Sequence, residues 1–510
     1  MRDLGLGYTA IHACQHDCVL FWKEHEHKDE CPECGESRWK YNDGKRKKIS
    51  HKILRYFPLK PRLQRLFMSK KTATDMRWHK EKRIIEENVL RHPVDSIAWK
   101  EFDKEHDWFA QEPRNVRLGL ASDVYERAFF MMSLLIPGLK SPGNDIDVYM
   151  RPLIDELKEL WEDGVETYDA STKQNFQLHA AMLWTINDFP AYGNLSGWSI
   201  KGKLACPTCN KDTCFLSLKH GKKICYMDHH RYLPLEHSWR KRMTMFNGKQ
   251  EHRLQPRDLS GDDVLEQLSL VEEVSFGKPP KKKKRKRSEL ELNWRKKSIF
   301  FQLPYWKTLK LRHNLDVMHI EKNICDNVLG TLMSIDGKTK DTVKARMDLE
   351  AMGRRKELHL RRHGTKYEVP PACYTLSANK RKGLCEWLKS VKFPDGYASN
   401  ITRCVNATDG KISGMKSHDC HVFLQQLLLI AVRGYLRKDV STALVELSFF
   451  FKELCCRTLK VDVLERLERE IVLILCKLEM IFPPAFFNVM VHLAVHLPHE
   501  TKLSGPVQYR

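Results

Sequence analysis

The fold of this chain is decided by Asn115-Val-Arg-Leu-Gly-Leu-Ala-Ser-Asp123 and Gln177-Leu-His-Ala-Ala-Met-Leu-Trp-Thr-Ile-Asn-Asp188, two apolar segments that each end in an aspartate. The first alternates in the manner of a short strand, and the second is an apolar run of strand length. Between them, Ala128–Ile136 is another apolar run, and Ile146–Trp161 carries apolar residues at the spacing of an amphipathic helix. The predicted order is strand–Asp, strand, helix, strand–Asp, which indicates an α/β domain.

Asp123 and Asp188 are candidate catalytic residues because each follows a predicted strand. Two carboxylates at the ends of adjacent strands could share divalent metal ions for phosphoryl transfer. Aspartates at strand ends are also common turn formers, and this alternative stays open.

The composition is that of a globular, basic protein. The chain has 510 residues, 42% of them hydrophobic and 30% charged, which fits about three domains. Lys and Arg number 87 against 65 Asp and Glu, so the formal net charge is +22. This excess favours a polyanionic partner, most commonly nucleic acid. The longest apolar runs are shorter than the ~18 residues of a membrane span, so no membrane association is predicted.

One run, Lys278 to Arg287, holds eight positive charges inside a polar segment that is expected to be a linker, and the remaining net charge of +14 leaves the rest of the chain basic as well. Two prolines followed by seven consecutive basic residues are typical of a nuclear import signal, although a plain charged linker has the same composition. The chain is therefore predicted to lie in the nucleus. The residues of the predicted signal are Lys281, Lys282, Lys283, Lys284, Arg285, Lys286 and Arg287.

Sixteen cysteines in a nuclear chain do not fit a disulfide framework. The first cluster has the spacing Cys14-x3-Cys18-x12-Cys31-x2-Cys34. Four thiolates in two close pairs can surround a tetrahedral Zn²⁺, and the turn after Cys31 has the form of a zinc knuckle. The pattern predicts a zinc ribbon, while three intervening histidines leave the ligand set open.

A second cluster begins with Cys206-Pro-Thr-Cys209, which is half of a zinc site because Zn²⁺ needs two more ligands. The nearby candidates are Cys214, Cys225, His229 and His230. A distant candidate is the pair His492-x3-His496, whose spacing places both imidazoles on one helix face. A histidine pair on an apolar helix can equally serve packing, and spacing alone leaves the choice open.

Four longer strings stand out: Arg117-Leu-Gly-Leu-Ala-Ser-Asp123, Ser141-Pro-Gly-Asn-Asp-Ile-Asp-Val-Tyr149, Trp184-Thr-Ile-Asn-Asp-Phe-Pro-Ala-Tyr192 and His313-Asn-Leu-Asp-Val-Met-His-Ile-Glu-Lys-Asn323. Together they resemble the transposase of plant CACTA (En/Spm-type) DNA transposons. The tail, from Ile481 to Tyr509, resembles the domain of unknown function that follows in the same proteins. The resemblance covers nearly the whole chain. It implies an RNase H-like core of the DDE type, interrupted by a large insertion.

The same superfamily is similar to the antigen-receptor (V(D)J) recombinase, and that similarity assigns residues. The first acid follows the first strand and matches Asp123, and the second precedes a CxxC and matches Asp188. Two Mg²⁺ or Mn²⁺ ions held there would activate water and then a 3′-hydroxyl for attack on DNA phosphodiesters. A late histidine pair completes the zinc site of the pattern. The implied zinc ligands are Cys206, Cys209, His492 and His496.

Two departures from the family pattern indicate an incomplete active site. The family's third acid, a glutamate, lies beyond the histidine pair and is expected beyond Arg510, as in a truncated copy; Glu321 is a weak internal substitute. The segment between Asp123 and Ala128 is shorter than in the family, so the core is expected to be partly deleted and its sheet re-paired. The chain is therefore predicted to be a transposase by descent that is inactive as made. The alternative is a non-enzymatic nuclear zinc-dependent DNA-binding protein.

The expected fold class is α/β plus α, with five segments. A zinc-ribbon module occupies 1–50, the RNase H-like core with its CxxC occupies 51–250, and a basic linker occupies 251–295. A helical insertion follows at 296–400, and a helical C-terminal domain at 401–510 carries the histidine pair. The expected partners are DNA, in the form of transposon ends, and a second copy of the chain in a homo-oligomer, with no small-molecule substrate.

Overall fold

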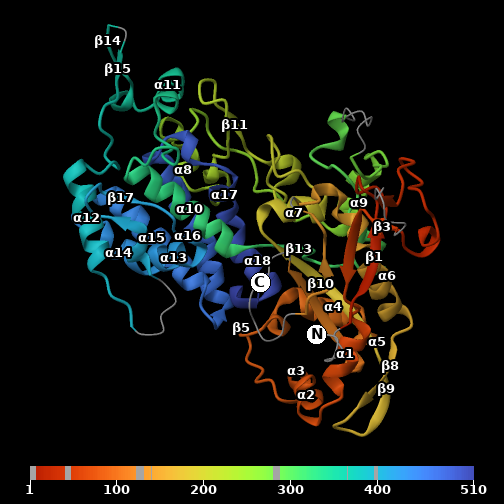
Figure 1. Cartoon of the computed structure of the whole chain (residues 1–510). Coiled ribbons are helices and arrows are strands. Elements are labelled where there is room, and N and C mark those ends of the chain that lie inside the picture. Colours follow the sequence, from red (N-terminus) through yellow and green to blue (C-terminus); the bar gives the residue numbers. More distant parts are fainter. Residues whose placement is uncertain are drawn as a thin grey trace. The chain divides into compact units, whose positions relative to one another are not determined.

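The computed structural model describes residues 7–40, 48–121, 131–138, 141–278, 288–364, 366–394 and 400–509 (Figure 1). Asp123 and the predicted import signal, Lys281–Arg287, lie outside the described residues. The chain forms two compact units. Unit 1 comprises 1–87, 96–200 and 259–314, and unit 2 comprises 88–95, 201–258 and 315–510. The segment 51–250, predicted as the core, contributes to both units.

Unit 1 combines small sheets with helices, so the predicted mixed α/β character is confirmed. Its strands are β1 (Thr9–Ala13), β2 (Trp39–Lys40), β3 (Ile49–Ser50), β4 (Lys52–Tyr56), β6 (Val116–Ala121), β7 (Leu134–Leu135), β8 (Val165–Asp169), β9 (Gln174–Leu178), β10 (Ala180–Asn187) and β13 (His313–Leu315), which ends at the boundary with unit 2. Its helices are α1 (Lys60–Phe67), α2 (Lys70–Asp75), α3 (Trp78–Glu81), α4 (Ile97–Glu105), α5 (Asp107–Gln111), α6 (Ile146–Glu162), α7 (Phe189–Ser196) and α9 (Gly261–Ser269).

A three-stranded sheet in the order β13-β10-β6 contains β6, the first predicted aspartate-terminated strand, and β10, which makes up most of the second. The second was predicted from Gln177, but Gln177 and Leu178 end β9, and β10 begins at Ala180. β6 and β10 are parallel, with Ala180 opposite Val116 and Ile186 opposite Ala121. β10 is buried along almost its whole length, as expected for the central strand of such a sheet. Because parallel strands end at the same edge, the C-terminal ends of β6 and β10 lie side by side.

Helix α6 packs against β10 and supplies much of the core of unit 1. Its apolar positions recur at helical spacing and are nearly inaccessible to solvent. They include Leu153, Ile154, Leu157 and Leu160. Trp161 at the end of the helix stacks on Phe109, with the ring centroids 5.4 Å apart. The sequence prediction of this helix is confirmed.

The apolar run Ala128–Ile136, predicted as one strand, differs from expectation. Of its described residues, only Leu134–Leu135 form a strand, β7, which pairs antiparallel with β4 in the sheet β1-β4-β7. β6 therefore has β10 as its neighbour, and β7 lies in a different sheet. The physical reason is that β1 covers only one edge of β4, so the other edge offers unpaired backbone groups to β7.

Unit 2 is largely helical, as the sequence indicates for the C-terminal half. Its helices are α8 (Ser238–Lys241), α10 (Val317–Leu332), α11 (Val343–Ala351), α12 (Ala378–Ser390), α13 (Ser417–Val422), α14 (Leu428–Ala431), α15 (Lys438–Leu454), α16 (Val461–Ile481), α17 (Val489–Leu493) and α18 (Leu497–Ser504). Its short strands are β5 (Val89–Leu90), β11 (Leu216–Ser217), β12 (Ile224–Cys225), β14 (Arg361–His363), β15 (Lys366–Glu368), β16 (Val405–Asn406), β17 (Lys411–Ile412) and β18 (Leu459–Lys460).

Two helix pairings order the centre of unit 2: α10 packs on α13, and α15 packs on α16 (Figure 1). A π-helical turn, Phe423–Leu427, connects α13 to α14. In the part of the chain that the structure describes, no helix combines the length and the apolar character that crossing a bilayer requires.

A buried ion pair fastens the segment after the basic linker to α6. Lys296 Nζ lies 2.6 Å from Asp147 Oδ1, and both side chains are almost completely buried. Lys296 Nζ also donates to the Asn144 carbonyl at 2.7 Å, and the Ile299 amide donates to Asp147 Oδ2 at 3.1 Å. Burial raises the pKa of Asp147 to about 6 even with Lys296 beside it. The pair is thus costly to dehydrate and depends on both partners.

We expect Lys296→Met to destabilise unit 1 by about 3–5 kcal/mol, because it leaves the Asp147 carboxylate buried without its cation. Chemical denaturation monitored by tryptophan fluorescence measures the loss. The double variant Lys296→Met with Asp147→Asn should recover most of the free energy of unfolding. A single variant as stable as the wild type would contradict the assignment.

Candidate metal centres and strand-end aspartates

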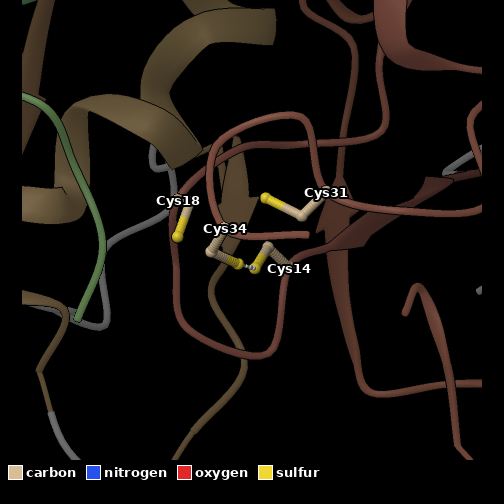
Figure 2. A group of neighbouring side chains, drawn as sticks. All are labelled: Cys14, Cys18, Cys31 and Cys34. Carbon is tan, nitrogen blue, oxygen red and sulfur yellow. Dashed lines mark hydrogen bonds between the residues drawn. The ribbon is translucent and has the colours of Figure 1, made fainter. Parts of the chain in front are cut away.

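The four N-terminal cysteines gather around one point in unit 1 (Figure 2). β1 leads directly into Cys14, whose Sγ accepts the His16 amide at 3.3 Å. In the turn after Cys31, Gly35 has φ +72°, and its amide donates to the Cys31 carbonyl at 2.8 Å. Glycine adopts this left-handed conformation without a Cβ penalty, which explains the residue after Cys34.

The sulfur geometry of this cluster fits a tetrahedral ion. All four Sγ atoms lie within 4.8 Å of one another, and Cys14 Sγ lies 3.7 Å from Cys34 Sγ. A Zn–S bond of about 2.3 Å gives a tetrahedral edge of about 3.8 Å. The arrangement of Cys14, Cys18, Cys31 and Cys34 could therefore hold a metal such as zinc.

The electrostatics of the cluster favour a cation at its centre. Burial raises the pKa of the Cys31 thiol to about 12, and burial together with the charge of Cys14 raises that of Cys18. Burial also opposes ionisation of Cys34, but a hydrogen bond from the Glu36 amide and bonds from neighbouring thiols lower its pKa overall. A divalent ion would stabilise all four thiolates at once and remove this mutual repulsion.

Gly277 closes the cluster from a distant part of unit 1. A Cβ at this position would lie 2.3 Å from Cys18 Sγ, and the residue has φ +89°. Its amide donates to Asp145 Oδ1 at 2.8 Å, which fixes it against the start of α6. Only glycine fits this approach, and no local sequence signal identifies it.

We expect Gly277→Ala to lower the metal affinity of the N-terminal cluster roughly 10-fold or more, because the methyl group would displace Cys18. Competition with a chromophoric chelator measures the affinity. Gly143→Ala is the matched control, since Gly143 also has positive φ (+65°) but no atom within 4 Å of its Cβ position. Equal affinities in the two variants would contradict this role.

The second cluster brings Cys206 and Cys209 together with the distant His492 and His496, all buried and all in unit 2. Cys209 Sγ lies 3.3 Å from His492 Nε2 and 3.2 Å from His496 Nε2. Cys206 Sγ lies 3.4 Å from His496 Nε2 and accepts the Cys209 amide at 3.4 Å. Two sulfurs and two imidazole nitrogens at these separations suit a tetrahedral Zn²⁺.

The candidate ligands that follow Cys209 closely in the sequence lie outside this ligand group. Cys214 Sγ accepts a hydrogen bond from Arg231 Nη1 at 3.4 Å, and Cys225 lies in strand β12. His230 stacks on Phe246, with the ring centroids 4.3 Å apart. The distant histidine pair, and not these residues, lies beside Cys206 and Cys209.

A second layer of polar residues orients the cluster. His229 Nε2 lies 3.2 Å from His492 Nδ1, and His229 Nδ1 lies 2.5 Å from Glu479 Oε1. This chain of contacts holds His492 with Nε2 toward Cys209 and fixes its tautomer. On the other side, the Tyr232 hydroxyl lies 2.9 Å from Cys209 Sγ and can donate to a thiolate. Burial raises the pKa of Glu479 to about 8 and lowers that of His229 to about 3.

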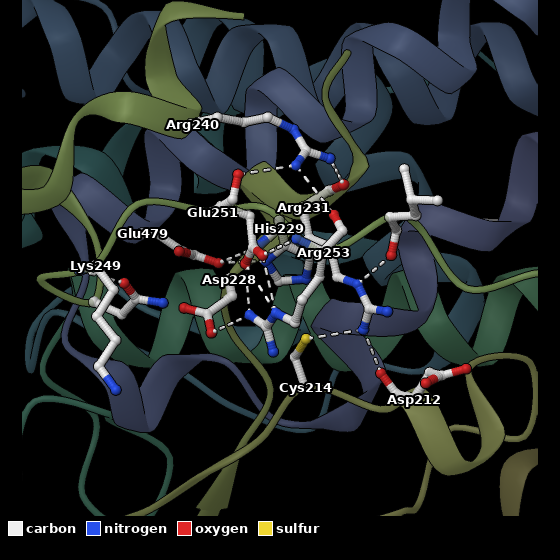
Figure 3. A network of polar contacts seen from close by, with 12 residues as sticks. Asp212, Cys214, Asp228, His229, Arg231, Arg240, Lys249, Glu251, Arg253 and Glu479 are labelled. Atoms are coloured by element: carbon white, nitrogen blue, oxygen red, sulfur yellow. Dashed lines mark hydrogen bonds and ion pairs between the residues drawn. The ribbon is translucent and has the colours of Figure 1, made fainter. Parts of the chain in front are cut away.

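Buried arginines hold the loop that carries His229 and Tyr232 (Figure 3). Arg240 donates to four backbone carbonyls, those of Arg231, Leu233, Glu251 and Arg253. Arg231 donates to the Asp212 carbonyl at 2.6 Å and the Leu254 carbonyl at 2.5 Å. Because each guanidinium bridges several backbone segments, the loop around the short 3-10 helix His229–Tyr232 has a fixed shape.

We expect His229→Phe to weaken metal binding at the second cluster roughly 10–100-fold, because His492 loses the partner of its Nδ1. Zinc competition and the visible spectrum of the Co²⁺ form report the site directly. His230→Phe is the matched control, since an aromatic ring there preserves the stacking on Phe246. The assignment fails if the control and His229→Phe bind Co²⁺ alike.

Asp188 lies at the predicted strand end and also begins a helix. It is the N-cap of α7, and its Oδ1 accepts the Ala191 amide at 2.7 Å. It follows Ile186, the register partner of Ala121 at the end of β6. Asp123 follows Ala121 by two residues and lies outside the described part of the chain.

Glu321, the weak substitute for a third acid, has its carboxylate engaged elsewhere. It lies in α10 of unit 2, where His421 Nδ1 lies 2.7 Å from its Oε2 and Gln425 Nε2 donates to its Oε1 at 3.0 Å.

Two family models match parts of the chain. Residues 87–127 and 124–271 match the model described as transposase family tnp2, and residues 454–510 match a domain of unknown function (DUF4218). These matches indicate a transposase, a class of protein that acts on DNA. Cys206 and Cys209 fall in the matched segment 124–271, and His492 and His496 fall in 454–510, so the second cluster joins the two family matches. No curated protein and no solved structure matches the chain.

Proposed function

We propose that the chain is by descent a DDE-type transposase of the CACTA (En/Spm) kind, a class that cleaves DNA and transfers strands by two-metal phosphoryl transfer, and that its own catalytic set is incomplete. The observation that carries this proposal is the parallel pairing of β6 with β10. Ala121 and Ile186 are register partners, and Asp123 and Asp188 each come two residues after one of them. An RNase H-like core in which two acids share one sheet edge has this arrangement.

Asp123 and Asp188 would hold Mg²⁺ or Mn²⁺, since carboxylate oxygens are the ligands that these ions prefer. When bound, the ions supply Lewis-acid activation of a water or 3′-hydroxyl and stabilise the leaving oxygen. The rigid start of α7 keeps Asp188 at the sheet edge, because its Oδ1 is tied to the Ala191 amide.

The remaining parts of the proposal concern DNA handling. The two cysteine-containing clusters would hold structural Zn²⁺, and Lys281–Arg287 would direct the chain to the nucleus. The net charge of +22 supports binding to DNA phosphates, with transposon ends as the specific partner and a homo-oligomer as the working assembly. The five segments expected from the sequence would serve as the domains of this assembly.

The third acid of the DDE set has no assigned residue, because the Glu321 carboxylate is bound by His421 and Gln425. We therefore expect weak or absent cleavage by this chain alone. This favours a second candidate function, a nuclear zinc-dependent protein that binds DNA without cutting it. Its binding should fall steeply with salt and depend little on DNA sequence.

We expect any nicking of supercoiled transposon-end DNA in Mn²⁺ or Mg²⁺ to fall by roughly 10⁴-fold in Asp188→Asn, while DNA binding is unchanged. Asparagine caps a helix as well as aspartate does, so α7 should remain intact. Gel analysis of the plasmid measures nicking, and fluorescence anisotropy measures binding.

Asp163→Asn, at an exposed position after α6, is the control and should nick like the wild type. Nicking that survives in Asp188→Asn would refute catalysis at this edge. Wild-type binding without nicking in either metal would favour the non-enzymatic function.

A further inference from the structure

A third group of metal-ligand side chains lies in unit 2, away from both cysteine pairs. It consists of Glu321 in α10, His421 in α13 and Cys455, the residue that follows α15. One donor atom from each side chain lies within 4.8 Å of the others. None of the three belongs to the ligand sets described above.

Glu321 is the buried anchor of this group. Its side chain is fully buried, and its two oxygens face different partners, His421 Nδ1 at 2.7 Å and Gln425 Nε2 at 3.0 Å. Gln425 Nε2 also lies 3.2 Å from the Phe451 carbonyl in α15. Burial of a carboxylate is costly unless cations or hydrogen-bond donors compensate it. The groups around Glu321 therefore face a buried carboxylate that they must compensate.

The backbone at this group departs from a regular helix. Gln425 lies in the π-helical turn Phe423–Leu427, directly after α13. A π-helical turn is rare, is less favourable than α-helix, and occurs frequently at functional sites. Here it lies between His421 and the rest of the helix, where α13 faces α10.

Access from solvent distinguishes this group from the two cysteine-containing clusters. The His421 side chain is 25% exposed and Cys455 is partly exposed, whereas Glu321 closes the inner side. One side of the group is therefore buried and the other reaches water. Three protein ligands with one open position are the pattern of zinc sites that bind an exchangeable water or ligand.

We propose that Glu321, His421 and Cys455 form a third Zn²⁺ site, with a fourth position open to solvent. A carboxylate oxygen, an imidazole nitrogen and a thiolate suit Zn²⁺, whose preferences cover all three donor types. The simpler interpretation is an isolated Glu321–His421 ion pair. The two differ in Cys455, because the ion pair does not need a sulfur.

Metal stoichiometry of the full chain tests this site. We expect wild-type protein, stripped and reloaded, to bind three equivalents of Zn²⁺ or Co²⁺, and Cys455→Ser to bind two. Cys456→Ser is the matched control: Cys456 is exposed, its Sγ contacts the Lys452 carbonyl at 3.4 Å, and the variant should bind three. Elemental analysis counts the ions, and the sulfur-to-Co²⁺ absorption should fall only in Cys455→Ser.

The wild-type count decides the question even if a variant folds poorly. Two equivalents in the wild type would overturn the proposal, as would three equivalents in a folded Cys455→Ser protein. Glu321→Gln, which keeps the size of the side chain, should also bind two equivalents. Because the experiment measures metal content, a negative result would reject the third site without bearing on whether the chain cleaves DNA.

Discussion

Unit 2 depends on four buried donors that come from opposite ends of its sequence. Cys206 and Cys209 meet His492 and His496 across separations of up to 290 residues. Closing so long a loop costs conformational entropy, and a metal ion bound only by the folded arrangement would offset that cost. The Glu479–His229 contacts and the arginine-bridged loop extend this centre outward. The irregular segment 201–258 therefore has a defined position against the C-terminal helices.

Unit 1 has a corresponding constraint in the parallel pair β6 and β10. Parallel neighbours need a long connection, and the segment between them contains β7, α6 and the hairpin β8–β9. α6 packs on β10 and buries its apolar face there, so the connection also builds the core. The same pairing brings two strand ends, each followed by an aspartate, to one edge. The parallel pairing that builds the sheet thus also forms the edge proposed to bind catalytic metal ions.

The sequence predicted features whose signal is local. β6, β10 and α6 were recognisable because apolar periodicity reflects burial of one element, and Cys14–Cys34 because its ligands are close in sequence. The ligands that complete the site of Cys206 and Cys209 lie far away in the sequence. Family resemblance, and not spacing, indicates the histidine pair. The pairing of β7 with β4 depends on which sheet edge is free, which periodicity does not encode.

Residues that support the two ligand clusters were also hard to predict from local sequence. Glu479 interrupts an apolar helix, a signal that a buried acid has a partner, but nothing in the sequence names His229 as that partner. Gly277 approaches Cys18 only through the folding of a distant segment. The family string makes Glu321 only a weak catalytic substitute; in the structure Glu321 lies beside His421 and Cys455, with which it could hold a metal ion.

The central claim is that Asp123 and Asp188 share divalent metal at the edge of the β6–β10 sheet. An anomalous-difference X-ray map of the chain crystallised with Mn²⁺ and a transposon-end DNA tests it most directly. The account predicts manganese density within about 2.5 Å of both carboxylates, beside a DNA phosphate. Ordered carboxylates with no manganese between them, in crystals that hold zinc at the cysteine clusters and DNA elsewhere, would contradict it.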